Sequence, residues 1–113
     1  MNIFGIVCEY NPFHNGHLYH IEKSKELTGC DAVICVMGGN FNQRGLPCVL
    51  DKHTKANIAI NFGADVVVEL PTAFCTQSAE IFSLASIKIL NSLKNVTHLC
   101  FGLYRIKLSC YIF

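Results

Sequence analysis

Charged residues are scarce in this sequence: they make up 15% of its 113 residues, and the formal net charge is +1. The nine Lys and Arg residues are scattered, so composition gives no electrostatic reason to expect nucleic-acid or membrane binding by this chain alone. Hydrophobic residues make up 51%, which argues against intrinsic disorder. The length suits a single domain with a sizeable core.

Long hydrophobic runs and paired cysteines are also missing. No uninterrupted apolar stretch reaches the roughly 18 residues that cross a bilayer, and the N-terminus lacks the basic region of a signal peptide. None of the seven cysteines forms a CxxC pair, and Cys8, Cys35 and Cys100 fall inside apolar runs. This pattern favours small buried side chains in a reducing compartment over a disulfide or zinc framework. We therefore expect a soluble, cytoplasmic protein that makes no membrane contact.

Short apolar runs alternate with segments of helical periodicity. We predict strands at residues 2–8, 32–37, 64–70 and 97–101. Helices are predicted at 16–27, 51–63 and 78–93, with Asn15 and Asp51 as N-caps and Gly29 ending the first helix. In the second helix we expect Ala56, Ala59 and Ile60 to share one face. In the third helix we expect a stripe formed by Phe82, Ala85, Ile89, Leu90 and Leu93.

The resulting order is β-α-β-α-β-α-β with short connections. It predicts an α/β fold: a Rossmann-like parallel sheet with right-handed crossovers and helices on both faces. Such sheets bind ligands at the carboxyl ends of their strands, near the point where the strand order reverses. The distinctive segments all follow a strand, which predicts one shared site: the His14 loop, the 38–47 loop, residues 69–71 and Gly102. We also expect the fourth strand to lie beside the first.

One motif, His14-x-Gly16-His17, lies between the first predicted strand and the start of the first predicted helix. The start of a helix exposes unpaired N–H groups and the positive end of the helix dipole, which suits phosphate. We predict His14 and His17 as catalytic residues that stabilise the charge growing between an α-phosphate and its leaving pyrophosphate. Gly16 would let a base or phosphate approach the backbone. The alternative is a polar loop whose histidines merely cap the helix.

The motif resembles the HIGH signature of the nucleotidylyltransferase superfamily. Residues 5–17 (GIVCEYNPFHNGH) resemble, more narrowly, the bacterial tRNA(Met) cytidine acetate ligase family. The similarity continues in order through residues 37–45 (MGGNFNQRG), 63–65 (GAD), 69–71 (ELP), 77–80 (QSAE) and 99–102 (LCFG).

This resemblance implies an ATP-dependent ligase. Members of that family activate acetate with ATP as acetyl-adenylate and then acetylate N4 of the wobble cytidine in elongator tRNA(Met). The implied partners are thus ATP, acetate and this tRNA, and Mg²⁺ commonly accompanies ATP chemistry. The residues that the resemblance assigns to ATP binding are Val7, Cys8, Glu9, Tyr10, Asn11, Pro12, Phe13, His14, Asn15, Gly16, His17, Leu18, Tyr19, His20 and Gly102.

Other polar residues are weaker candidates. Gln43, Arg44 and Lys52 would contact phosphate or the acid, or would belong to a solvated loop and an exposed helix start. Glu69 is expected to be structural, because no titratable partner stands near it in the sequence. As for metal binding, His20, His53 and His98 lack metal-ligand spacing, and no metal site is predicted.

The resemblance stops at Gly102, where family members continue with Ser-Glu. Residues 1–102 are thus expected to form an incomplete nucleotide-binding domain. Residues 103–113 would be a divergent tail, either one more strand or a non-native end left by a frameshift. We expect this chain to be the N-terminal part of a ligase whose tRNA-binding segments it lacks. Two alternatives stay open: a small-molecule nucleotidylyltransferase, and a decayed half-domain without enzymatic activity. The sequence predicts no oligomeric state.

Overall fold

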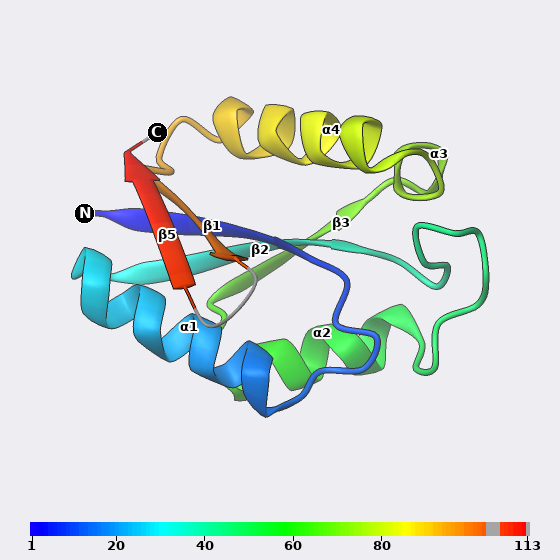
Figure 1. The fold of residues 1–113 in the computed structure, drawn as a ribbon, viewed down its shortest axis with the longest axis horizontal. Helices are drawn as coiled ribbons and strands as arrows, with labels where there is room; N and C mark the ends of the chain where they lie inside the picture. Colours follow the sequence, from blue (N-terminus) through cyan, green and yellow to red (C-terminus); the bar gives the residue numbers. More distant parts are fainter. Residues whose placement is uncertain (104–106, 113) are drawn as a thin grey trace.

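The chain folds into a five-stranded sheet with helices on both faces (Figure 1). The structure is a computed structural model, and it describes residues 1–103 and 107–112. The elements in chain order are β1 (Ile3–Cys8), α1 (Asn15–Thr28), β2 (Ala32–Gly38), α2 (Lys52–Asn61), β3 (Val66–Leu70), α3 (Thr72–Cys75), α4 (Ala79–Ser92), β4 (His98–Leu103) and β5 (Lys107–Ile112).

The sheet has the strand order β3-β2-β1-β4-β5. Strands β1 to β4 are parallel, with Gly5 of β1 aligned to Ile34 of β2 and to Leu99 of β4. The predicted parallel sheet is confirmed, as is the position of the fourth strand beside the first. The chain runs outward from β1 to β3 and then returns to the other side of β1. The strand order therefore reverses between β1 and β4, at the carboxyl end of β1.

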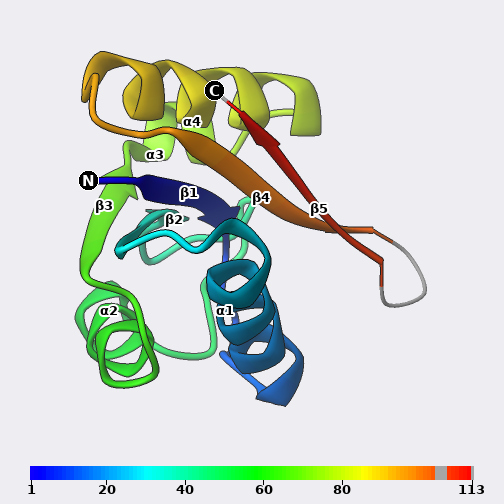
Figure 2. The same cartoon turned by 90° about the vertical axis from the view of Figure 1, so that its left-hand side faces the viewer.

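Helices α1 and α2 cover one face of the sheet, and α3 and α4 cover the other (Figure 2). Each face has its own buried cluster, with Phe4, Ile6 and Ile21 on the α1 side and Val36 and Leu90 on the α4 side. Helix α4 approaches β1 closely at Gly5, where an added Cβ would lie 2.7 Å from Leu90 Cδ1. This packing fixes the sheet and leaves the loops after β1 and β2 at one edge.

Several predicted boundaries are wrong by a few residues. His14, not Asn15, is the N-cap of α1, because its extended backbone lets its ring reach back to the helix start. Gly29 ends that helix in the left-handed region, as predicted (φ 62°). Asp51 caps α2 as predicted, by accepting the Thr54 N–H at 3.0 Å. A short helix that was not predicted, α3, begins after Pro71.

The predicted apolar stripes are only partly buried. Ala59 is fully buried but Ile60 is 48% exposed, and in the α4 region Leu90 is buried while Leu93 is 40% exposed. The apolar surface of these helices is thus broader than the face that the sheet covers. Among the described residues no helix is long and apolar enough to cross a membrane. The thiols of Cys8, Cys30, Cys35, Cys48 and Cys75 form no disulfide.

The end of the chain also differs from the prediction. Gly102 does not end the fourth strand but lies within β4, in register with Leu108 of β5. Strand β5 is antiparallel to β4 and extends the sheet beyond it. Residues 107–112 thus form the additional strand, and a frameshifted origin of residues 103–113 stays a prediction. Residues 104–106 and 113 lie outside the described residues.

Candidate functional site

The two motif histidines build the first turn of α1. His14 Nδ1 accepts the Gly16 N–H at 3.1 Å, and His17 Nδ1 accepts the His14 N–H, also at 3.1 Å. The N–H groups of His17 and Leu18 both donate to the His14 carbonyl. The alternative that these histidines cap the helix therefore holds for their Nδ1 atoms, which accept backbone N–H groups. Most of the N–H groups that we expected phosphate to use are already engaged within the turn.

This capping fixes which ring nitrogen carries the proton. A neutral imidazole has one donor and one acceptor nitrogen, and both Nδ1 atoms accept. The N–H of each ring is therefore at Nε2, and no hydrogen bond within the described residues uses either Nε2. The two rings stack with centroids 3.8 Å apart and an interplanar angle of 21°. The site thus presents a pair of parallel imidazoles whose free donors are both Nε2–H groups.

Partial burial keeps His17 neutral. Desolvation, together with the neighbouring His14 and His20, lowers the pKa of His17 from 6.5 to about 4. The ring lies against Tyr10, with centroids 4.7 Å apart, and against Phe13 at 5.5 Å. Tyr10 is itself buried, and its backbone adopts a positive φ of 49° that turns its ring inward. At neutral pH His17 therefore acts as a hydrogen-bond donor and not as a cation.

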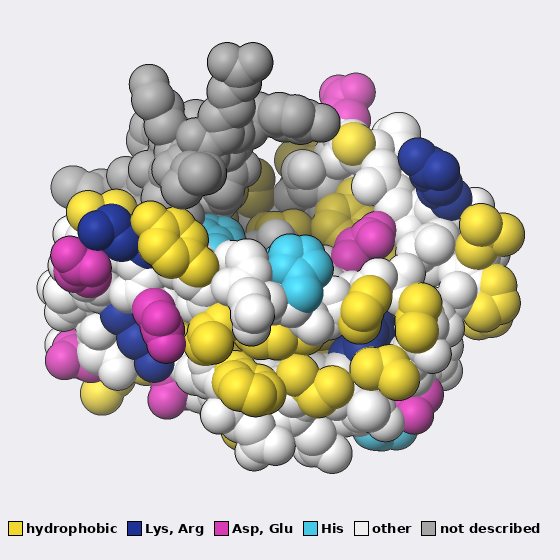
Figure 3. Space-filling view, turned by 60° about the horizontal axis from the view of Figure 1, so that its bottom comes forward, with side chains coloured by type: hydrophobic (Ala, Val, Ile, Leu, Met, Phe, Trp, Pro, Cys, Tyr) yellow, Lys and Arg dark blue, Asp and Glu magenta, His cyan; other side chains and the backbone are white. Residues whose placement is uncertain are grey.

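The site is open to solvent on the face formed by α1 and α2. In the space-filling view, histidine side chains reach the surface in the middle of this face, bordered by hydrophobic side chains (Figure 3). Phe13 stacks on Phe62, with ring centroids 5.6 Å apart, and so extends the aromatic contacts from α1 to the end of α2. Aromatic side chains thus adjoin the two imidazoles.

Side chains of the loop after β1 hold the loop after β2. The Glu9 carboxylate accepts the Gln43 N–H at 3.0 Å, and the Asn11 side chain accepts the Val49 N–H at 2.7 Å. Within the second loop, Asn42 Oδ1 accepts the N–H groups of Arg44 and Leu46. Glu9 and Asn11 were predicted only as ATP contacts. Their side chains already tie the two loops together, and any contact with ATP comes in addition to that role.

A polar pocket opens between these loops. Its volume is about 330 Å³, and Glu9, Asn42, Gln43 and Arg44 line it. The structure thus brings Gln43 and Arg44, two of the weaker candidates, to the same strand-end edge as the histidine motif. The side chains of Glu9 and Arg44 in its lining could hold a small polar group.

Lys55 is a buried cation that the sequence analysis missed. Only 1% of it is exposed, and its Nζ donates to the Glu9 carbonyl at 3.2 Å, to the Gly38 carbonyl at 3.2 Å and to Cys48 Sγ at 3.4 Å. It thereby joins the ends of β1 and β2. A lysine four residues after the N-cap of an amphipathic helix usually faces solvent, so the sequence carried no signal of its burial.

Lys52 and Glu69 form an ion pair at 3.0 Å, with both side chains partly exposed. No titratable partner stands near Glu69 in the sequence, but the fold brings Lys52 to it from 17 positions away. Glu69 also adjoins Gly39, where an added Cβ would lie 2.6 Å from its Oε1. Lys52 remains a candidate for phosphate or acid contact, now with a carboxylate beside it.

The remaining predicted contacts differ in what their side chains can offer. The Cys8 thiol is partly buried and donates to the Val36 carbonyl at 3.7 Å. Tyr19 is 47% exposed on α1. Gly102 follows Leu99, the partner of Gly5, by three residues, which places it level with Cys8 across the β1–β4 boundary. Each of these assignments to ATP stays a prediction.

The described residues show no metal centre: none of their His, Cys, Asp and Glu side chains gather in groups of three or more that could hold an ion. His98 instead contacts Cys30, with 3.3 Å between Nδ1 and Sγ. Burial lowers the pKa of His20, which lies on α1 beside the motif.

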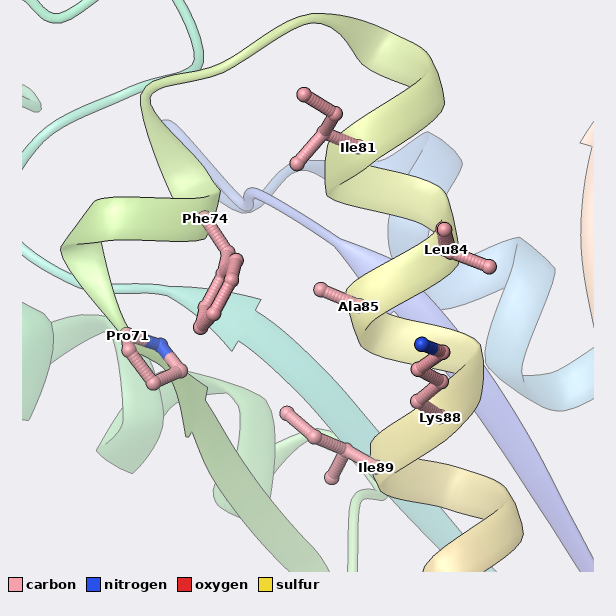
Figure 4. A pocket seen from close by; sticks show the side chains of 7 residues that line it. All are labelled: Pro71, Phe74, Ile81, Leu84, Ala85, Lys88 and Ile89. Atoms are coloured by element: carbon pink, nitrogen blue, oxygen red, sulfur yellow. The ribbon is translucent and has the colours of Figure 1, made fainter.

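A second pocket lies away from this site, between α3 and α4. Its volume is about 350 Å³, and its walls are almost entirely apolar, with Lys88 at the rim (Figure 4). Phe74, Ile81 and Leu84 are each more than 40% exposed there. Among its lining residues only Lys88 could donate to a phosphate, and Lys88 lies on α4, which covers the opposite face of the sheet from α1 (Figure 2), so this pocket is not part of the candidate nucleotide site.

The model of one protein family, described as HIGH nucleotidyl transferase, matches residues 1–111. The chain belongs to the HIGH nucleotidyl transferase family. Within that family it is 60% identical over 102 residues to a tRNA(Met) cytidine acetate ligase of Clostridium botulinum strain Langeland and 53% identical to one of Clostridium novyi. The predicted resemblance is thus confirmed. These matches cover 90% of this chain, which spans about a quarter of the length of these relatives.

Solved structures give the same result for this HIGH nucleotidyl transferase fold. A crystal structure of Thermotoga maritima TmcAL bound with alpha-thio ATP is similar to this chain, with a TM-score of 0.88 and 50% sequence identity. It covers 90% of this chain, and the match spans 25% of the Thermotoga chain. An apo form of the same protein matches with a TM-score of 0.87. The Rossmann-like fold that the sequence predicted is confirmed.

Proposed function

We propose that this chain is the ATP-binding part of a tRNA(Met) cytidine acetate ligase. The observation that carries the proposal is the pair of capping imidazoles at the start of α1, whose Nε2–H groups are both free. Its support from other proteins is the 60% identity to the Clostridium botulinum ligase and the similarity to a structure bound with alpha-thio ATP. We assign residues 1–102 to the nucleotide-binding domain and the cytoplasm as the place of action.

In this proposal, ATP lies along residues 7–20 with its phosphates at the start of α1. A carboxylate oxygen of acetate attacks the α-phosphorus, the bond to the bridging oxygen breaks, and pyrophosphate leaves with the electron pair. The Nε2–H groups of His14 and His17 donate hydrogen bonds to the oxygens on which this negative charge grows. Donors fixed before the reaction stabilise such charge without reorganisation, often by a few kcal/mol each.

The acetyl group then passes from acetyl-adenylate to N4 of the wobble cytidine of elongator tRNA(Met), with AMP as the leaving group. We propose that the tRNA is held by segments of the relatives that lie outside the quarter matched by this chain. Mg²⁺ would supply positive charge to the triphosphate; the described residues show no cluster of His, Cys, Asp and Glu side chains that could hold it. No step above depends on the ion.

The test is acetate-dependent exchange of labelled pyrophosphate into ATP. It is measured for this chain and for a version extended with the remaining three quarters of the Clostridium botulinum relative. Exchange by the extended protein, lost in His14→Asn and His17→Gln, would support the proposal. An extended protein that folds but shows no exchange would contradict the activation chemistry.

The breadth of the family gives a second candidate function. The matching family model describes nucleotidyl transferases in general, which favours a small-molecule nucleotidylyltransferase as the alternative. Such an enzyme would transfer AMP or CMP to a phosphorylated metabolite. Turnover of ATP with 4′-phosphopantetheine or nicotinamide mononucleotide, and none with acetate, would favour it. ATP binding too weak to detect would instead favour a decayed half-domain.

A further inference from the structure

Lys55 stands apart from the proposed chemistry, yet it is the most buried charge near the site. It lies on α2, and its ammonium group is directed between the carboxyl ends of β1 and β2. Burying a charge is unfavourable unless partners replace its lost water, and buried lysines are usually paired with a carboxylate. Here the partners are two carbonyls and a thiol. Among the described side chains, no carboxylate lies within 4.0 Å of Lys55 Nζ.

The three acceptors belong to three different parts of the site. The Glu9 carbonyl lies in the loop that leads to the histidine motif, the Gly38 carbonyl ends β2, and Cys48 belongs to the loop after β2. The side chain of Glu9 and that of Asn11 hold the second loop from the other side. Lys55 is therefore the common anchor beneath both loops, and its removal would free the two loops together.

The charge has a further effect at this edge of the sheet. Burial raises the pKa of the Cys8 thiol well above its usual range, while the positive charge of Lys55 acts in the opposite direction. The field of Lys55 thus reaches the last residue of β1. An anion at the strand ends would supply the negative charge that the protein itself does not place beside this ammonium group.

We propose that Lys55 is a positioning residue for the phosphates of the nucleotide: it anchors the loops after β1 and β2, and its buried charge draws the anion to the strand ends. This inference rests on the proposed nucleotide site and goes beyond it, because Lys55 is not among the residues assigned to ATP. It predicts that Lys55 makes the site favour a nucleotide with phosphates over a nucleoside without them, although Lys55 touches neither ligand.

The test compares ATP with adenosine. Lys55→Met removes the ammonium group and keeps the aliphatic stem, and Lys88→Met removes one positive charge from α4 on the opposite face of the sheet as a matched control. We expect Lys55→Met to weaken ATP binding about 10-fold or more and adenosine binding less than about twofold. Lys88→Met should change neither. Equal losses for ATP and adenosine, or no loss, would overturn the role of the charge.

A second measurement needs no ligand. Hydrogen exchange at the amides of Gln43 and Val49 should quicken in Lys55→Met and stay unchanged in Lys88→Met; unchanged exchange in Lys55→Met would overturn the anchoring role. Wild-type protein that binds neither ATP nor adenosine would contradict the proposed function. The anchoring role would then be decided by amide hydrogen exchange alone. Should circular dichroism show that Lys55→Met does not fold, Lys55→Gln, which loses the charge but keeps an N–H donor, takes its place in the comparison of ATP with adenosine, and Lys55→Leu takes its place in the hydrogen-exchange measurement.

Discussion

The imidazole of His14 lies flat on that of His17, with ring centroids 3.8 Å apart, and each ring accepts a backbone N–H through Nδ1. The two Nδ1 bonds cap α1, and they leave the Nε2–H group of each ring without a partner among the described residues. Capping and ligand binding are usually treated as competing explanations for a histidine at the start of a helix. In this chain the two explanations are compatible, because capping uses only the Nδ1 atoms.

Substitutions at His14 can separate these two roles. Asparagine is a good N-cap, so His14→Asn should leave the free energy of unfolding nearly unchanged, whereas His14→Ala should lower it by about 1 kcal/mol. Both should reduce pyrophosphate exchange by the extended protein to a similar degree, about 100-fold, because both lack the Nε2–H donor. Urea unfolding and exchange assays check the two effects. Full exchange activity in His14→Asn would show that the imidazole acts only as a cap.

The stability of the fold should depend on pH through His17. Its pKa is about 4 in the folded protein and near 6.5 in the unfolded chain, so the unfolded state binds more protons between these values. Stability should consequently fall as the pH drops from about 6.5 to about 4, and His20, whose pKa is also lowered, acts in the same direction. Urea unfolding at several pH values measures this. In His17→Gln the unfolding free energy should change less with pH between about 6.5 and 4. An unchanged pH dependence would contradict the lowered pKa of His17.

Two adjacent glycines should respond differently to alanine. At Gly38 an added Cβ would lie 2.5 Å from the Sγ of Cys75, which is buried and cannot move away. We expect Gly38→Ala to cost about 1–3 kcal/mol of stability, as overpacking in a core does. At Gly39 the nearest atom is Oε1 of the partly exposed Glu69, which can swing aside, so Gly39→Ala should cost less. Thermal unfolding compares them, and Cys75→Ala should rescue Gly38→Ala but not Gly39→Ala.

The link between the two loops can be tested at Asn11. Asn11→Ala removes the acceptor of the Val49 N–H, and we expect faster proteolysis within residues 39–50 and a loss of roughly 1 kcal/mol in stability. Asn91→Ala on the exposed surface of α4 is the matched control and should change neither. Equal proteolysis rates in wild type and Asn11→Ala would show that the bond does not hold the loop.

The ion pair between Lys52 and Glu69 should contribute little to stability. Both side chains are more than a third exposed, and such pairs contribute about 0–1 kcal/mol. Lys52→Met and Glu69→Gln should therefore each shift the unfolding free energy by less than about 1 kcal/mol, and salt should reduce the effect further. A loss of several kcal/mol in low salt would mean that the pair supports the loop near Gly39.

The sequence predicts most of the fold because its local signals agree with the tertiary structure. The apolar run before His14, the cap at Asp51 and the stop at Gly29 each have a local physical cause, and all three appear in the structure. The prediction fails where a long-range contact decides. The sequence carries no signal that Lys55 is buried or that Glu69 pairs with Lys52, because the residues that meet are distant in the chain.

The same distinction applies to the candidate site. The histidine motif was found because its residues are adjacent in sequence and stand between a strand and a helix. The tautomer of its rings was not predictable, since it depends on the extended backbone that makes His14 rather than Asn15 the N-cap. Likewise, no local pattern shows that the side chains of Glu9 and Asn11 accept hydrogen bonds from a loop more than thirty residues away.

The stacking of Phe13 on Phe62 has a practical consequence. The sequence contains no tryptophan, so Phe62→Trp would give the protein a single indole, placed against the turn that carries the histidines. Its emission would then serve as an optical reporter of events at that turn. Nucleotide occupancy could be followed in real time without labelling either molecule.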